Sequence, residues 1–155
     1  MTFVITGLRS NEFEALNSLS EEDLAARHVI TYVADEKPGF PCRVTLDDAE
    51  IGERVFPVNY MYQPNETPYK ASHAVFVREN AVEAAPYVDE VPLSLSTRLL
   101  ALRGLDANHL MVDADIAQGD DIKPLLQKFF ENSEIDYIQM HYARRGCFAA
   151  VAHRE

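Results

Sequence analysis

Two apolar segments joined by a short polar turn close the chain, in the run Ile135-Asp136-Tyr137-Ile138-Gln139-Met140-His141-Tyr142-Ala143-Arg144-Arg145-Gly146-Cys147-Phe148-Ala149-Ala150-Val151-Ala152-His153-Arg154. The pattern predicts a β-hairpin whose turn is residues 144–146. In that register Ala143 lies opposite Cys147, and His141 lies opposite Ala149.

The predicted hairpin has an apolar face and a polar face, because successive side chains of a strand point to opposite sides. The apolar face comprises Ile138, Met140, Tyr142, Phe148, Ala150 and Ala152. The polar face comprises Tyr137, Gln139, His141, Cys147 and His153. We expect the first face to join the core and the second to carry any chemistry.

A helix over residues 121–131 is predicted to cover the apolar face of this hairpin. Its hydrophobic residues recur at the spacing of a core-facing stripe: Ile122, Leu125, Leu126, Phe129 and Phe130. Asp120 or Asp121 can cap its start, Pro124 is tolerated in the first turn, and Asn132 can end it.

The remaining segments predict one α+β domain over residues 1–155, with a mostly antiparallel, curved sheet. Short N-terminal helices are expected at residues 11–19 and 21–27, the second capped by Ser20. Further strands are expected at residues 3–7, 28–33, 54–62 and 73–78, and a second hairpin at residues 97–103 and 109–116. Pro57 predicts an edge or a bulge in its strand, because proline cannot donate to a ladder.

Composition and charge exclude several classes of function. A net charge of −11 would repel a phosphate backbone, so no nucleic-acid partner is expected. No basic leader and no long apolar run are present, which predicts a soluble cytoplasmic protein with no membrane partner. Asp113 and Asp115 could approach one cation, but two carboxylates are fewer than a hard cation needs. We therefore predict no metal and no cofactor.

The polar face of the hairpin offers one candidate catalytic pair, Cys147 as nucleophile and His141 as base. In the predicted register the two are diagonal neighbours within mutual reach. A nearby imidazolium, with Arg144 and Arg145 in the turn, would favour a thiolate. Gln139 could donate to a developing oxyanion. The alternative is that both cysteines are free thiols buried as small hydrophobes.

A candidate ligand-binding groove is expected between the loop that carries Cys42 and Arg43 and the polar face of the hairpin. Tyr69 and Arg78 would wall this groove. In a thiol-dependent enzyme Arg43 or Arg145 would act as an anion clamp, because a guanidinium binds carboxylate or phosphate bidentately. The alternative for these arginines is pairing with the more numerous acidic residues of the chain.

Several short motifs resemble a known family. They are Gly39-Phe40-Pro41-Cys42-Arg43, Asp48 through Gly52-Glu53, Pro68-Tyr69, Ala74-Val75-Phe76-Val77 and Gly146-Cys147-Phe148. Together they resemble a bacterial family of short proteins catalogued as domain of unknown function 1203, over nearly the whole chain.

The resemblance implies a shared fold and a shared site, and it names no substrate. The residues that match are Pro41, Cys42, Arg43, Gly52, Glu53, Pro68, Tyr69, Phe76, Gly146 and Cys147. In place of the family's Gly-Pro-Ile-Phe-Val-His block this chain has the run from His73 to Arg78. Any function of that last histidine is therefore in doubt here.

Three functions follow from these observations. The first is a domain that binds a small molecule or a protein without turnover. The second is a thiol-dependent enzyme that uses Cys147 with His141. The third is a self-associating subunit, a homodimer whose contact would use Tyr60, Tyr62 and Tyr69, since tyrosine is enriched at interfaces.

Overall fold

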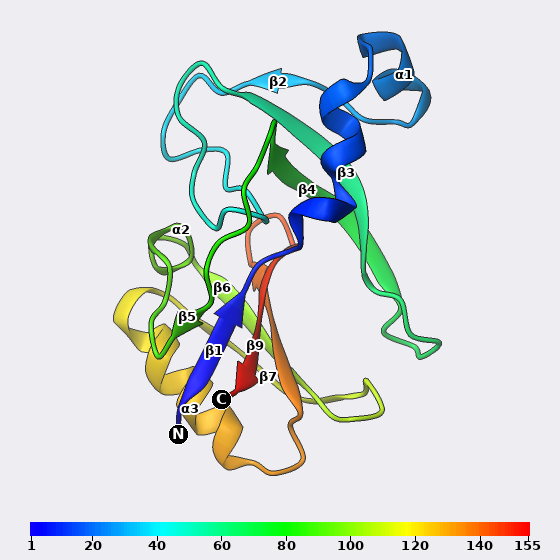
Figure 1. Ribbon diagram of the computed structural model, residues 1–155. Helices are drawn as coiled ribbons and strands as arrows, with labels where there is room; N and C mark the ends of the chain where they lie inside the picture. The colour runs from blue at the N-terminus through cyan, green and yellow to red at the C-terminus, as the bar shows by residue number, and fades with distance from the viewer.

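Two antiparallel sheets form the framework of the computed structural model, which describes residues 1–155 (Figure 1). The larger sheet has the order β5-β1-β9-β8-β6-β7, with β1 Phe3–Thr6, β5 Tyr87–Val88, β6 Leu100–Leu105, β7 Met111–Ala117, β8 Tyr137–Tyr142 and β9 Cys147–Arg154. The smaller sheet has the order β2-β3-β4, with β2 Tyr32–Val33, β3 Arg54–Gln63 and β4 Ala71–Arg78. The α+β class and the antiparallel pairing are confirmed, but the strands form two open sheets where one curved sheet was predicted.

The helix α3 spans Ile122–Glu131, which confirms the predicted amphipathic helix. A single 3-10 turn, η3 Gly119–Asp121, precedes it, and the Asp121 side chain makes no capping bond. The other helical segments are short: η1 Ser10–Glu12, η2 Glu14–Ser18, α1 Glu21–Ala26 and α2 Leu93–Ser96. The predicted cap of α1 is confirmed, because Ser20 Oγ accepts the Asp23 N–H at 3.1 Å. No helix is long and apolar enough to span a bilayer.

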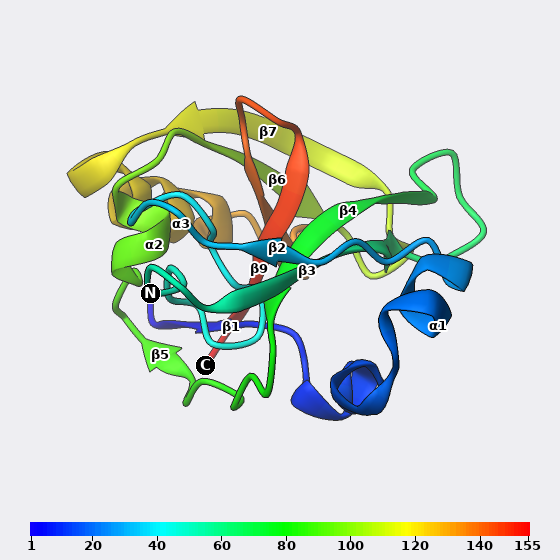
Figure 2. The same cartoon turned by 90° about the horizontal axis from the view of Figure 1, so that it is seen from above.

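The hairpin β8–β9 is covered on both of its faces. On one face it packs against α3, in a buried cluster that includes Leu126, Phe130, Met140 and Ala150. On the other face Phe148 joins a second cluster with residues of β3, β4 and the N-terminal helices. Seen from above, α2 and α3 lie on the opposite side of the molecule from α1, with the strands between them (Figure 2). Most of the predicted polar face is therefore covered, and only His153 near the end of β9 is exposed.

The register of the hairpin differs from the prediction near the turn. Tyr142 lies opposite Cys147 and His141 lies opposite Phe148, because a β-bulge interrupts the pairing beyond Met140. The connection has four residues, 143–146, and Gly146 adopts φ 74° while its N–H donates to Tyr142 O at 2.8 Å. The bulge exchanges the faces of Cys147 and Phe148 relative to the predicted register.

Other strand predictions hold with shifted bounds. The hairpin β6–β7 is confirmed, whereas the strand predicted over residues 28–33 is reduced to the two residues of β2. Pro57 lies in β3, the middle strand of the smaller sheet rather than an edge strand. It is tolerated because β2 pairs only with Arg54 and Val55, and the one bond to residue 57 on that side, from the Ile30 N–H at 3.4 Å, goes to the Pro57 carbonyl and needs no proline N–H.

Packing between α3 and the hairpin can be tested at Leu126, which is fully buried. We expect Leu126→Ala to lower the free energy of unfolding by about 2–5 kcal/mol, because it leaves a cavity under the helix. The exposed Lys128→Ala on the same helix is the control and should change stability by less than about 0.5 kcal/mol. Urea unfolding measures both; equal effects of the two substitutions would contradict this packing.

Candidate functional site

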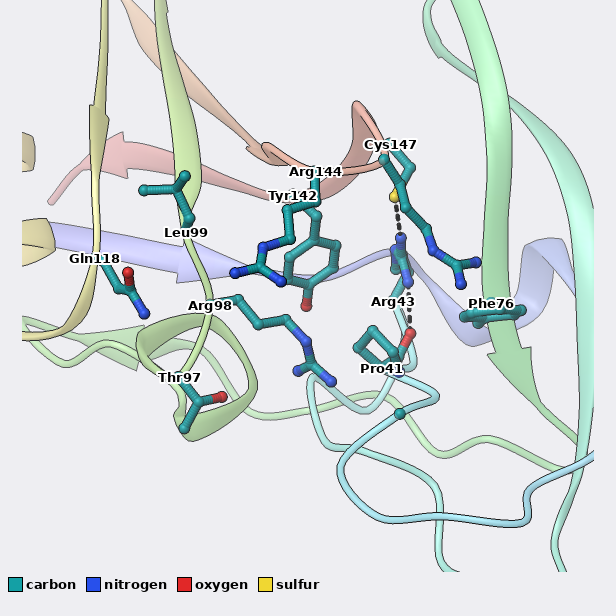
Figure 3. Close-up of a pocket in the computed structure, with 12 residues that line it drawn as sticks. Pro41, Arg43, Phe76, Thr97, Arg98, Leu99, Gln118, Tyr142, Arg144 and Cys147 are labelled. Carbon is teal, nitrogen blue, oxygen red and sulfur yellow. Dashed lines mark hydrogen bonds between the residues drawn. The ribbon is translucent and has the colours of Figure 1, made fainter.

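The turn of the β8–β9 hairpin lies at the junction of the two sheets, where it borders a cavity of about 330 Å³ (Figures 1 and 3). The cavity is formed by the loop that follows Gly39, by β4, by the segment after α2, and by the hairpin turn. Its lining residues are Gly39, Pro41, Arg43, Phe76, Thr97, Arg98, Leu99, Gln118, Tyr142, Arg144, Arg145 and Cys147. Four arginines line this cavity, which we call the arginine cavity, and no aspartate or glutamate does.

Arg43 forms the buried wall of the cavity and is 2% exposed. Its backbone N–H donates to Phe76 O at 3.0 Å, which attaches the loop to β4. Its side chain donates from Nη1 to Pro41 O at 2.6 Å and from Nη2 to Cys147 Sγ at 2.9 Å (Figure 3). Its Nε donates to Phe148 O at 2.7 Å. A guanidinium has five N–H groups, so two remain for a ligand.

No carboxylate pairs with the Arg43 guanidinium. Burial lowers the pKa of Arg43, but an arginine side chain remains charged at neutral pH. Its Cζ atom lies 4.7 Å from the centre of the Tyr142 ring and 5.9 Å from that of Phe76, and aromatic faces stabilise a cation in part. Arg43 is thus a buried cation with carbonyl, sulfur and aromatic neighbours, and with no anionic partner from an acidic residue.

The other three arginines of the cavity differ in how they are held. Arg98 forms a bidentate ion pair with Asp48, at 2.6 Å and 3.0 Å, and also donates to Ser94 O at 2.8 Å. Arg144 and Arg145 lie in the hairpin turn, are exposed, and make no side-chain hydrogen bond or ion pair. The guanidinium of Arg144 lies beside the Tyr142 ring (Figure 3). The cavity therefore concentrates positive charge that a single carboxylate only partly offsets.

The predicted proximity of His141 and Cys147 is wrong, because the bulge places them on opposite faces of the sheet. Cys147 is 5% exposed and lines the arginine cavity, whereas His141 is fully buried beneath the smaller sheet. There the His141 ring contacts those of Tyr62 and Phe148, with centroids 4.9 Å and 5.8 Å away. His141 faces away from the sulfur and makes no hydrogen bond to it, so it is not placed to act as its base.

Burial, followed by the charge of Arg103, lowers the pKa of His141 from 6.5 to about 3. The ring is therefore neutral at pH 7. Its Nε2 is 3.3 Å from Gln139 Oε1, and its Nδ1 has no hydrogen-bond partner. The Gln139 amide is engaged as well, since its Nε2 donates to Tyr62 O at 3.3 Å. Gln139 and His141 thus form a buried polar pair inside the second cluster.

Three other predicted site residues lie outside the arginine cavity. Cys42 is buried, and its Sγ accepts the backbone N–H of Arg78 at 3.3 Å. The Arg78 side chain forms an ion pair with Glu53, with Nε 2.7 Å from Oε2. This agrees with the alternative prediction, in which these arginines pair with acidic residues of the chain. Tyr69 follows β3 and is 39% exposed. Of the predicted site residues, the structure brings together Arg43, Arg145 and Cys147.

Sequence reasoning missed Arg98 and Tyr142 as cavity residues, and it placed Arg144 beside Cys147 without naming it as a ligand-binding residue. The tandem arginines of the turn, directly before Cys147, were a usable signal for Arg144. Tyr142 was assigned to the core face, and it does contact the core while its ring also borders the cavity. Arg98 offered no local signal, because its partner Asp48 is fifty residues away. No group of three or more His, Cys, Asp or Glu side chains is arranged to hold a metal ion.

Comparison with known proteins finds one family. The model of the family described as "Protein of unknown function (DUF1203)" matches residues 39–154, which include every residue that lines the arginine cavity. No curated protein and no solved structure matches this chain.

The buried imidazole predicts a loss of stability in acid. Below about pH 6.5 the unfolded chain binds a proton at His141, but the folded chain does not until about pH 3. The free energy of unfolding should therefore fall as the pH is lowered through this window, by at most about 1.4 kcal/mol per pH unit from this group. His141→Gln should flatten the fall, as measured by urea unfolding at pH 7, 5 and 4.

The exposed His153→Gln is the matched control for this experiment. It should leave the pH dependence as in the parent protein. An unchanged slope in His141→Gln would show that the imidazole is not held neutral by the fold.

Proposed function

This chain belongs to the DUF1203 family of proteins of unknown function, and we propose that it binds small anionic molecules in the arginine cavity. The observation that carries the proposal is the buried Arg43 guanidinium, which has no carboxylate partner and lines a cavity with three more arginines. A carboxylate or phosphate group of the ligand would supply the missing negative charge.

The Arg43 charge is costly to bury, because it leaves water without gaining an acidic partner. A buried ion without a partner of opposite charge is strongly destabilising, and hydrogen bonds to carbonyl oxygens compensate only part of that cost. Arg43 has two N–H groups left after its three protein bonds. An anion in the cavity would accept them and offset the charge.

The arrangement of the other arginines suits a ligand that enters from solvent. Arg144 and Arg145 lie on the exposed turn, while Arg43 forms the buried wall. Guanidinium groups bind carboxylate and phosphate oxygens in a planar, two-pronged geometry. A volume of about 330 Å³ is at the small end of the range for ligand pockets, which favours a compact molecule.

The charge of the whole chain restricts the class of anion. At −11 the protein repels an extended polyanion, so the proposal is confined to small molecules that enter the local positive field of the cavity. A reducing compartment such as the cytoplasm suits the chain, because Cys42 and Cys147 are both free thiols.

A thiol-dependent reaction is the second candidate, favoured by the contact between Arg43 Nη2 and Cys147 Sγ. The sulfur lies on the wall of the same cavity, so a bound anion would be held beside it. Such a reaction would have to proceed without His141, for the reason given above. The binding function needs only the arginines and is therefore the one proposed.

Titration calorimetry with inorganic phosphate tests the proposal. We expect the double variant Arg144→Gln/Arg145→Gln to bind phosphate at least about tenfold more weakly, because a hydrogen bond to a charged group contributes about 1.5–3 kcal/mol. Both side chains are exposed and unpaired, so the variant should fold normally.

The matched control is Arg9→Gln/Arg27→Gln, which removes the same charge from two exposed arginines outside the cavity. It should bind phosphate nearly as well as the parent protein does. Equal weakening of phosphate binding in both double variants would show that the effect comes from net charge and not from the cavity. That result, or no binding of phosphate by the parent protein, would overturn the proposed function.

A further inference from the structure

A second cavity, of about 240 Å³, adjoins the arginine cavity on the outer face of the smaller sheet. The two cavities have four lining residues in common: Arg43, Phe76, Arg145 and Cys147. The Phe76 ring thus borders both spaces. A molecule held by the arginines would have this second cavity directly beside it.

The lining of the second cavity is mainly apolar. Beyond the shared residues it is formed by side chains of β2, β3 and β4 and by the residue Ile30, which precedes β2. Ile30 and Tyr32 are 53% and 44% exposed, so they present apolar surface to solvent at this cavity. Apart from Tyr32 and the four residues shared with the arginine cavity, its only titratable residue is His73.

We propose that the ligand of this protein is an amphipathic anion, with a carboxylate or phosphate head among the arginines and a short aliphatic or aromatic tail in the second cavity. This inference rests on the proposed anion-binding function. An inorganic anion would offset the charge of the arginines, but it would leave the apolar surface of Ile30, Tyr32 and Phe76 uncovered. A tail covers that surface, and each buried methylene should tighten binding by roughly threefold to fourfold.

Arg145 links the two parts of the site. It lies in the exposed hairpin turn and lines both cavities. A long side chain of this kind can place its charged end on the head group while its methylenes cover the tail. The specificity of the site would then come from the combination of head and tail.

Phenyl phosphate and inorganic phosphate test the inference, because they differ by one aromatic ring on the same head group. We expect calorimetry to show that the parent protein binds phenyl phosphate at least about tenfold more tightly. Ala74→Phe should abolish this advantage, because Ala74 is exposed, lines the second cavity, and lies on the same face of β4 as Phe76. Its binding of inorganic phosphate should be unchanged.

The matched control is Ala114→Phe, the same substitution at an exposed position of β7 that lines neither cavity. This variant should keep the full preference for phenyl phosphate. Equal affinity of the parent protein for the two ligands would overturn the inference and leave the anion site intact. Retention of the preference in Ala74→Phe would also overturn it, whereas failure to bind either ligand would reject the proposed function itself.

Discussion

Burial of the Arg43 guanidinium connects the parts of this molecule that are distant in sequence. Its backbone is bonded to β4, its side chain donates to the carbonyl of Phe148 in β9, and its third bond reaches the sulfur of Cys147. One side chain therefore ties the smaller sheet and the loop after Gly39 to the central hairpin of the larger sheet. The same side chain brings a positive charge into the interior with no acidic partner.

The location of this charge explains how an acidic protein can hold an anion-binding site. The chain carries −11 overall, yet four arginines meet around one cavity, and only Arg98 is neutralised there, by Asp48. Elsewhere partly buried arginines such as Arg54 and Arg78 are paired with glutamates. Arg43, Arg144 and Arg145 have no carboxylate partner and meet at one cavity, so the local field there opposes the field of the whole chain.

Periodicity in the sequence was sufficient to predict the elements that form the core. The stripe of α3 and the alternation in β8 identify which faces are apolar, and both predictions are confirmed by the cluster that contains Leu126 and Met140. The register near the turn could not be predicted in the same way, since a single bulged residue reverses the faces of Cys147 and Phe148. The predicted Cys147–His141 pair depended on that register.

The candidate site was predictable only where it is local in sequence. Arg145 and Cys147 are neighbours in the hairpin, and Arg43 was expected to face it, so these three residues were identified before the structure. Arg98 was not, because its position depends on a long-range ion pair and on the packing of α2 beside the loop. The polar face of the hairpin was expected to be open to ligands, but strand alternation cannot reveal that the smaller sheet covers it.

The most direct measurement is a crystal structure of the protein grown in phosphate at a concentration that saturates the site seen by calorimetry. We expect electron density for one phosphate inside the cavity, with its oxygens within hydrogen-bond distance of Arg43 and of at least one of Arg144 and Arg145. A cavity that holds only water under these conditions, with the phosphate bound elsewhere, would contradict the claim that the buried guanidinium recruits the anion.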